Sequence, residues 1–398
     1  MTEETKIKER VYSIDLLRGM VMMIMLLDHT RDFVHSGAFG SDPTDLSTTT
    51  VPLFFTRWIT HYCAPTFVFL SGISIYLQKM RGKPNRELSW FLLTRGFWLI
   101  LMEFTLVRFG FVFNVDYSFF GAAQVIWVIG VSMIIMAGLI YLPMTAIAIY
   151  GLVLVLFHNL LDGIQVSPGV GQILWMVLHQ PGPVPLFGGA TTVFVLYPLI
   201  PWTGVMALGY AAGSVYAWDA ERRQKWLLKA GIIVTAAFVI VRSINVYGDP
   251  SRWSYQERGG IFTFLSLLNT TKYPPSLLYL LMTLGPALII LALADRIDGK
   301  AIWQRVCITF GSVPMFYYLL QFPLAHALGV TLSYLAGKDI AFYFRNFPAS
   351  FASAPSDAGF PLWVVYAAWI AGLIILFPLC YWWRNLKRRN KHWALSYL

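Results

Sequence analysis

The sequence predicts an all-α membrane protein, a polytopic bundle of about ten transmembrane helices. Hydrophobic residues make up 57% of the 398-residue chain and charged residues only 13%, whereas a soluble domain carries roughly 25% charged residues. Stretches of about 20 apolar residues, the length that spans the hydrocarbon core, recur along the chain. The 15 Trp, 20 Tyr and 29 Phe residues suit aromatic belts at two membrane interfaces.

The first five expected helices are apolar stretches with polar or basic connections. The helix at 12–34 follows the basic segment "KIKER", and the helix at 53–78 ends at "QKMRGKPNRE". The helix at 88–112 contains arginines and a glutamate within an otherwise apolar run. The helices at 121–141 and 144–161 are joined only by "YLPM". If these two formed one re-entrant unit, the orientation of the remaining helices would not change.

The last five expected helices are separated by more strongly charged segments. The helix at 191–217 contains "GYAAG", which is typical of close helix packing, and ends at "DAERRQK". The helix at 226–244 follows this basic segment, and the helix at 274–294 ends before "DRIDGKAIWQR". The helices at 306–335 and 361–383 complete the bundle. Prolines inside several of these runs are expected to kink them.

The charges in the connections predict that both termini are cytoplasmic. Lys and Arg cluster near the termini and in alternate connections, whereas 162–190 contains neither, and cytoplasmic loops are enriched in these residues. The same sorting explains the net charge of +10 better than a nucleic-acid partner does. We expect a single transmembrane domain over 1–398, with a cytoplasmic segment at 1–11 and a basic cytoplasmic tail at 384–398. Because no cleavable signal is recognisable, a multi-pass protein of the bacterial inner (plasma) membrane is expected.

The cysteines and histidines do not suggest a metal site. Cys63, Cys307 and Cys380 lie in apolar runs at no metal-ligand spacing, so neither a disulfide nor a zinc site is expected. The sequence contains no HxxxH or HExxH pattern. We therefore expect no metal cofactor.

The first helix carries ionisable residues on one face. At about 100° per residue, Asp15, Arg18, His29 and Asp32 fall on one stripe. Arg18 and His29 are about 16 Å apart along the axis, with Arg18 toward the cytoplasmic end. Because charges are costly in lipid, this face is expected to meet protein or water. The alternatives are that Asp15 and Arg18 only neutralise each other, and that His29 is a packing residue.

The end of this helix offers an acid–base group. Asp32 lies one turn beyond His29 and can hold one ring nitrogen, which leaves the other free to accept a proton. Asp28 points elsewhere and is expected to pair with Arg31 or with another helix. Solvated charge at the membrane rim is the alternative for both aspartates.

Further candidates lie on other helices. Arg57 and His61 are four residues apart near the outer surface, and His61 is expected to assist His29. Ser71 lies deeper and serves either close packing or substrate contact. Glu103 is expected to pair with an arginine, namely Arg57, Arg108 or Arg18. Lys272 is expected to be a snorkelling interfacial cation or a substrate contact.

Several motifs carry a family resemblance. The segments "SIDLLRGM", "RWITHYCAPTFVFLSG", "TRGFWLILME", "AQ" before the fourth helix and "TTKYPPSLLYLLMTLGP" resemble the heparan-α-glucosaminide N-acetyltransferase-like family of multipass membrane acyltransferases. The opening is also similar to the acyltransferase-3 family, whose signature is Arg, ten residues, then His. Here these residues are Arg18 and His29.

The resemblance implies transfer of an acetyl group from cytoplasmic acetyl-CoA to a hydroxyl or amine at the outer face. The acceptor is expected to be a sugar or a lipid-linked group. By this resemblance, Arg18 and Ser71 would bind the acyl-CoA co-substrate and His29 would serve catalysis. From their positions beside it, His61, Asp28 and Asp32 are also expected to be catalytic. Arg57, Lys272 and His35 would contact the acceptor, and His35 is held as the alternative essential histidine. Direct transfer and an acyl-enzyme both stay open, as does a homodimer.

Two other functional classes are weighed against the acyltransferase. A transporter or flippase of a sugar-linked or lipid-linked substrate would show inverted repeats around a site at the membrane midplane, and the sequence shows no repeat. A non-catalytic membrane scaffold would not explain the ionisable stripe of the first helix. Both therefore rank below the enzyme.

Overall fold

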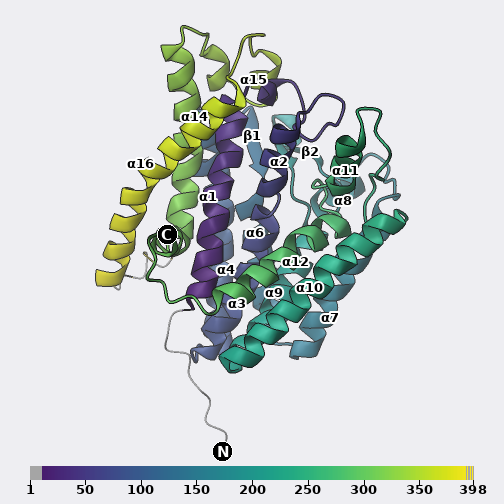
Figure 1. Ribbon diagram of the computed structural model, residues 1–398, viewed down its shortest axis with the longest axis vertical. Helices are drawn as coiled ribbons and strands as arrows, with labels where there is room; N and C mark the ends of the chain where they lie inside the picture. The colour runs from purple at the N-terminus through teal and green to yellow at the C-terminus, as the bar shows by residue number, and fades with distance from the viewer. Residues whose placement is uncertain (1–10, 391, 393–394, 396, 398) are drawn as a thin grey trace, which may run out of the picture.

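The computed structural model describes residues 11–390, 392, 395 and 397. Most of the segment 1–11 and part of the tail 384–398, for which a cytoplasmic location is predicted, lie outside the described residues. Long helices run side by side, and α1 (Tyr12–Val34) lies among them (Figure 1). The strands and several short helices gather at the end of the bundle where α1 ends. We call this end the sheet end, and the opposite end, where α1 begins, the N-terminal end.

The helices fall into a long set and a short set. The longer helices after α1 are α3 (Cys63–Met80), α4 (Asn85–Met102), α6 (Val125–Leu139), α7 (Met144–Phe157), α9 (Leu199–Ala212), α10 (Ala220–Ile244), α12 (Leu277–Ala294), α14 (Pro314–Leu335) and α16 (Leu362–Arg389). The shorter ones are α2 (Val51–Thr60), α5 (Arg108–Val112), α8 (Val170–Leu178), α11 (Gly260–Leu268), α13 (Ile302–Gly311) and α15 (Ala349–Ala352). A π-helical turn, Glu103–Val107, joins α4 to α5.

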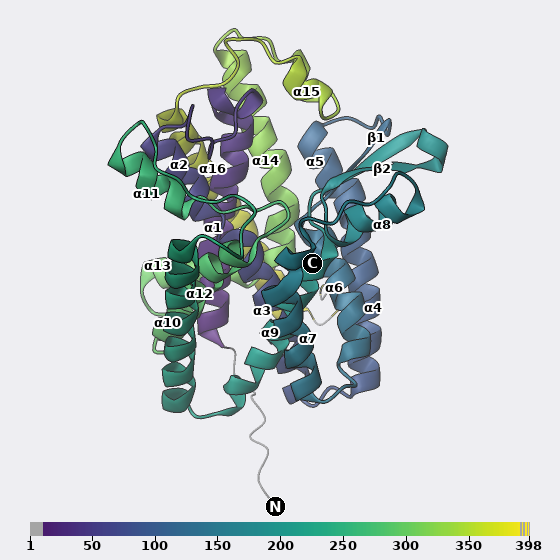
Figure 2. The same cartoon turned by 90° about the vertical axis from the view of Figure 1, so that its right-hand side faces the viewer.

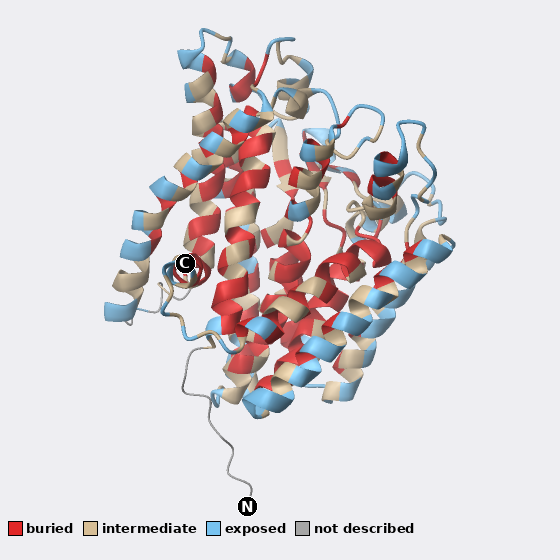
Figure 3. Ribbon diagram, in the orientation of Figure 1, coloured by how far each residue is buried: buried red, intermediate tan, exposed pale blue. Residues whose placement is uncertain are grey.

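Six helical runs of the described chain are long and apolar enough to cross a membrane. They are Asn85–Val112, Met144–Leu161, Ala220–Ile244, Leu277–Ala294, Pro314–Leu335 and Leu362–Arg389. Residues on the outer sides of α10 and α16 are exposed, whereas buried residues gather around α1 (Figure 3). The exposed residues of these two helices include Ile233, Ile240 and Ile374, as expected for lipid-facing surfaces. The number of ten spans and the cytoplasmic location of the termini stay predictions.

A three-stranded sheet corrects the all-α prediction. β1 (Phe119–Ala123) pairs parallel to β3 (Thr191–Val195), and β2 (Gly182–Leu186) pairs antiparallel to β3. The starts of the expected helices 121–141 and 191–217 are therefore extended. The physical reason is visible in "TTVFV", where β-branched residues alternate between buried and half-buried positions. The buried side chains of this sheet, Ala123, Val184, Val193 and Val195, form a small apolar cluster.

Two expected continuous helices are broken by proline. The run 53–78 divides between α2 and α3, because Pro65 has no N–H to donate to the carbonyl of His61. This carbonyl accepts a hydrogen bond from the Tyr279 hydroxyl at 2.8 Å instead. The run 306–335 divides between α13 and α14, and Pro314 occupies the first turn of α14.

The long helices form two groups on opposite sides of the molecule, and α1 packs against the group that contains α12 and α13. Figure 2 shows α4, α6 and α7 on one side of the molecule, beneath the strands, and α10, α12 and α13 on the other. The backbones of α1 and α13 touch, because a Cβ placed on Gly19 would lie 1.8 Å from the carbonyl oxygen of Cys307. A Cβ on Gly311 would lie 1.9 Å from the carbonyl oxygen of Asp15. Only glycine fits at these two positions, and the contact fixes the face that α1 turns to the interior.

Candidate functional site

Arg18, near the N-terminal end of α1, is bound by neighbours on α1, α3 and α13. Its guanidinium forms an ion pair with Asp15 at 3.1 Å and donates hydrogen bonds to the Gly311 carbonyl at 2.9 Å and the Ser74 hydroxyl at 3.2 Å. The pairing of Asp15 with Arg18 is therefore present. Arg18 also lines a cavity of about 100 Å³ together with Ser71 and Arg95, so the ion pair does not remove it from the interior space.

His29 lies near the other end of the same helix and faces a larger cavity. Its Nδ1 is 3.4 Å from a carboxylate oxygen of Asp32, a long hydrogen bond. A carboxylate only accepts hydrogen bonds, so the proton of a neutral imidazole lies on Nδ1 in this pair, and Nε2 then has a free lone pair. The ring packs against Phe322 with 4.2 Å between ring centroids. The imidazole is thus oriented by one carboxylate and one aromatic ring.

Two aspartates and two arginines form an alternating chain beside His29. Arg31 donates to Asp32 at 2.7 Å and to Asp28 at 3.1 Å, and Arg57 of α2 donates to both oxygens of Asp28 at 2.7 and 2.6 Å. Asp28 therefore pairs both with Arg31 and with another helix. Asp28 and Arg31 are buried, and opposite charges at these distances offset the cost of burying each one. This chain joins α1 to α2.

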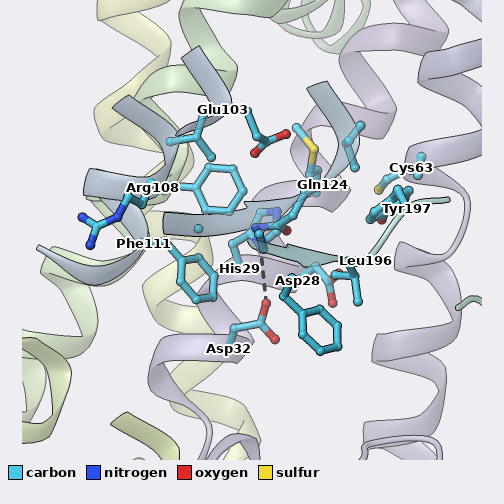
Figure 4. A pocket seen from close by; sticks show the side chains of 18 of the residues that line it. Asp28, His29, Asp32, Cys63, Glu103, Arg108, Phe111, Gln124, Leu196 and Tyr197 are labelled. Carbon is cyan, nitrogen blue, oxygen red and sulfur yellow. Dashed lines mark hydrogen bonds and ion pairs between the residues drawn. The ribbon is translucent and has the colours of Figure 1, made fainter. Parts of the chain in front are cut away.

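The cavity next to His29 has a volume of about 270 Å³ and lies where α1, α2, α6, α14 and the sheet meet (Figure 4). We call it the central cavity. Its polar lining groups are Asp28, His29, Asp32, Arg57, Thr60, Glu103, Arg108, Gln124, Tyr197, Lys272, Tyr273 and Tyr318. Aromatic and aliphatic side chains from the sheet, α5 and the region of α15 form much of the remaining wall. The cavity therefore combines an acid–base group with an apolar wall.

Two further cavities adjoin the central one. The cavity at Arg18, which we call the inner cavity, shares Phe67, Val125 and Tyr318 with the central cavity. A cavity of about 340 Å³ toward the sheet end shares Arg57, Lys272 and Tyr273 with it. We call it the acceptor-side cavity, because Arg57 and Lys272 are the acceptor contacts predicted from the sequence. The three cavities are thus arranged in series, with Arg18 in the first and His29 in the second.

The predicted site residues are distributed over these three cavities. Arg18 and Ser71 line the inner cavity, and His29, Asp28 and Asp32 line the central cavity. His61 lines the acceptor-side cavity and not the central one, so the structure does not bring it to His29. Arg57 and Lys272 line both the central and the acceptor-side cavities.

His35 lies outside all three cavities. It follows α1, where its Nδ1 accepts a hydrogen bond from the Gly37 N–H at 3.0 Å. Its backbone lies beside Phe360 in an isolated bridge. Burial, together with the positive charge of Arg31, lowers the pKa of the His35 imidazole. The ring therefore serves the local turn rather than the interior space.

Glu103 corrects a predicted pairing. It was expected to meet an arginine, but one of its carboxylate oxygens accepts a hydrogen bond from the Trp127 N–H, in the first turn of α6, at 2.9 Å. Arg57 is occupied by Asp28, and Arg108 donates to the backbone carbonyls of Asn114, Asp116 and Phe119. The strand β1 places the start of α6 next to Glu103, and the sequence pattern did not reveal this strand.

Three further lining residues were not predicted as site residues. In the sequence, Gln124 belongs to the "AQ" motif, and Tyr273 follows Lys272 in "TTKYPPSLLYLLMTLGP". No sequence signal marks Tyr197. Although burial opposes ionisation of Tyr273, the charges of Lys272 and Arg57 lower the pKa of its hydroxyl. The described residues contain no group of three or more His, Cys, Asp or Glu placed to hold a metal ion.

Comparison with known protein families shows to which family the chain belongs. Residues 10–248 match the family described as heparan-α-glucosaminide N-acetyltransferase, catalytic. The chain belongs to this family. A search of curated proteins finds no match to the chain. The heparan-α-glucosaminide N-acetyltransferase match includes Arg18, His29, Arg57 and Glu103 but ends before Lys272. Membership implies a membrane acetyltransferase, in agreement with the long apolar helices.

Proposed function

We propose that the protein transfers an acetyl group across the membrane, from cytoplasmic acetyl-CoA to an amine or hydroxyl of a sugar at the outer face. The observation that supports this most directly is the series of three cavities, with Arg18 in the inner one and His29 in the central one. In this proposal the N-terminal end faces the cytoplasm and the sheet end faces outward. Acetyl-CoA itself then does not have to cross the membrane.

The inner cavity suits the narrow arm of the donor. Its size of about 100 Å³ leaves no space for a nucleotide, but an extended chain ending in a thioester fits such a passage. Arg18, with Ser71 nearby, would hold a carbonyl or phosphate of this arm, since guanidinium donates several hydrogen bonds in fixed directions. Lys79, Arg81 and Lys83, at the end of α3, would meet the nucleotide's phosphates outside the bundle.

The acceptor-side cavity suits a hydrated, polar acceptor. Its lining consists almost entirely of polar and charged residues: Asp42, Thr44, Asp45, Arg57, His61, Ser251, Asn269, Thr270, Thr271, Lys272 and Tyr273. Hydroxyls, amides and carboxylates are the groups that hydrogen-bond a sugar. Arg57, Lys272 and Tyr273 line both this cavity and the central one, so an acceptor held by them would present its nucleophile to His29.

The chemistry follows from the free lone pair of His29. The acceptor nitrogen or oxygen attacks the thioester carbon, and His29 Nε2 takes the proton that this atom loses. The bond from carbon to sulfur then breaks, and CoA leaves as a thiolate that must gain a proton. Asp32 keeps the imidazole in the required tautomer and stabilises its charged form. Transient transfer of the acetyl group to His29 uses the same lone pair, so the geometry permits either route.

The test compares two histidines of one segment. Purified protein in proteoliposomes receives labelled acetyl-CoA on one side and an amino sugar on the other, and acetylated sugar is measured. We expect His29→Gln to lower turnover by about 10²- to 10⁴-fold. His35→Gln should keep wild-type turnover. A loss in His35→Gln with full activity in His29→Gln would reverse the assignment. Movement of sugar without acetyl-CoA, and without product, would identify a transporter instead.

A further inference from the structure

Glu103 is a buried carboxyl group, and one of its two oxygens has no hydrogen-bond partner among the described residues. It is 1% exposed and begins the π-helical turn Glu103–Val107. One oxygen accepts the Trp127 N–H, whereas Oε1 has no hydrogen-bond partner among the described residues. A buried polar atom without a partner is costly, and π-helical turns are frequent at functional sites. Both features point to a ligand that completes the site.

No nearby cation explains the burial of Glu103. Arg57 is bound by Asp28, and the guanidinium of Arg108 is bound by carbonyls of the loop that precedes β1. Within the described part of the chain, no ion pair with Glu103 is present. The carboxylate lies at the start of α6, where the Trp127 N–H donates to Oε2 at 2.9 Å. Among the described residues, no hydrogen-bond donor holds the second oxygen, Oε1.

Glu103 lines the central cavity beside the start of α6, whose first residue also lines the inner cavity. Its partner Trp127 is two residues from Val125, and Val125 lines both cavities. Glu103 itself lines the central cavity. In Figure 4, Glu103 and Asp32 lie on opposite sides of the pocket, with the His29 ring between them. A donor that enters through the inner cavity would bring its sulfur to the Glu103 side and its carbonyl carbon toward His29.

We propose that Glu103 is a second catalytic residue, the acid that gives a proton to the departing sulfur of CoA. This inference rests on the proposed acetyl transfer. As the bond from carbon to sulfur breaks, its electron pair goes to sulfur, and the Oε1–H of Glu103 supplies the proton that yields the CoA thiol. The proton that His29 has taken from the acceptor then returns to Glu103 through water in the central cavity. No proton is gained or lost overall.

The test uses two acetyl donors that differ in their leaving group. Acetyl-CoA releases a basic alkyl thiolate, whereas S-(4-nitrophenyl) thioacetate releases a thiolate stable enough to leave unprotonated. Glu103→Gln keeps the size of the side chain and an acceptor for Trp127, but it cannot donate an acidic proton. We expect it to lower kcat/KM for acetyl-CoA by about 10²- to 10⁴-fold and kcat/KM for the thioacetate by far less. His29→Gln should lower both.

Controls separate this role from a structural one. Glu221→Gln makes the same change on an exposed residue of α10 that pairs with Lys225, and it should leave both donors unaffected. Glu103→Asp keeps a carboxyl group and should recover part of the acetyl-CoA activity. If Glu103→Gln does not yield folded protein, the two acetyl donors are compared in Glu103→Asp instead. Equal losses with both donors, or no loss, would overturn the inference. A wild-type protein without acetyl transfer would overturn the proposed function and the inference together.

Discussion

Replacing Gly19 by alanine tests the backbone contact that sets the interior face of α1. The new Cβ would lie 1.8 Å from the Cys307 carbonyl oxygen, whereas ordinary contact begins at 3.4 Å. One helix must therefore retreat by roughly 1.6 Å, the difference between these distances. Overpacking of an interior costs about 1–3 kcal/mol. We expect the upper part of this range, because the obstacle is backbone and cannot rotate away.

The same movement reaches Arg18, which we propose binds the donor. Gly311 lies one turn beyond Cys307 on α13, so a retreat of α13 lengthens the 2.9 Å hydrogen bond from Arg18 to the Gly311 carbonyl. We expect a raised KM for acetyl-CoA in addition to the lost stability. Stability is measured by SDS titration of purified protein in mixed micelles, followed by tryptophan fluorescence.

A glycine with open space around it provides the control. Gly138, near the end of α6, has no atom within 4 Å of its ideal Cβ, and alanine favours a helix over glycine by up to about 1 kcal/mol. Gly138→Ala should therefore be as stable as the wild type or more stable. If Gly19→Ala unfolds at the same SDS concentration as Gly138→Ala, the backbone contact does not hold α1 in place.

Two further predictions concern charged residues near the end of α1. Arg57→Met should destabilise the protein by about 3–5 kcal/mol, because it leaves Asp28 buried with only one arginine. Asp28→Asn added to it should recover much of this loss in the same SDS titration, and strictly additive losses would contradict the pairing. His35→Gln should make the protein less sensitive to acid. The lowered pKa of His35 means that unfolded chains bind its proton more readily, so wild-type stability falls as the pH drops below about 6.5. A variant with the same pH dependence as the wild type would contradict this assignment.

The helical parts of the site followed from the sequence because they depend on spacing within one element. Arg18, His29 and Asp32 share a face of α1 by helical periodicity alone, and the structure places all three in the interior. The same reasoning anticipated that Asp28 pairs with Arg31. Such relations need only a helix and a count of residues.

The remaining parts depend on contacts between segments far apart in the chain. Nothing in the pattern around Glu103 reveals that β1 turns the first turn of α6 toward it. His61 shares a helix face with Arg57, and both line the acceptor-side cavity, but only Arg57 also reaches the central cavity. Lys272 and Tyr273 reach the centre from a connection between α11 and α12. The run "TTVFV" was read as helix because an apolar stretch alone does not distinguish the two conformations.

The inner and central cavities share three lining side chains, and these affect what can pass through the molecule. They are Phe67, Val125 and Tyr318. A bilayer normally separates two aqueous spaces by about 30 Å of hydrocarbon, but here three side chains line both chambers at the point where they meet. In the proposed reaction, the space between these side chains limits the width of the donor segment that can reach His29. A narrow thioester arm would pass between these side chains, whereas the bulky adenine would stay outside, so only the acetyl group would be transferred to the other side of the membrane.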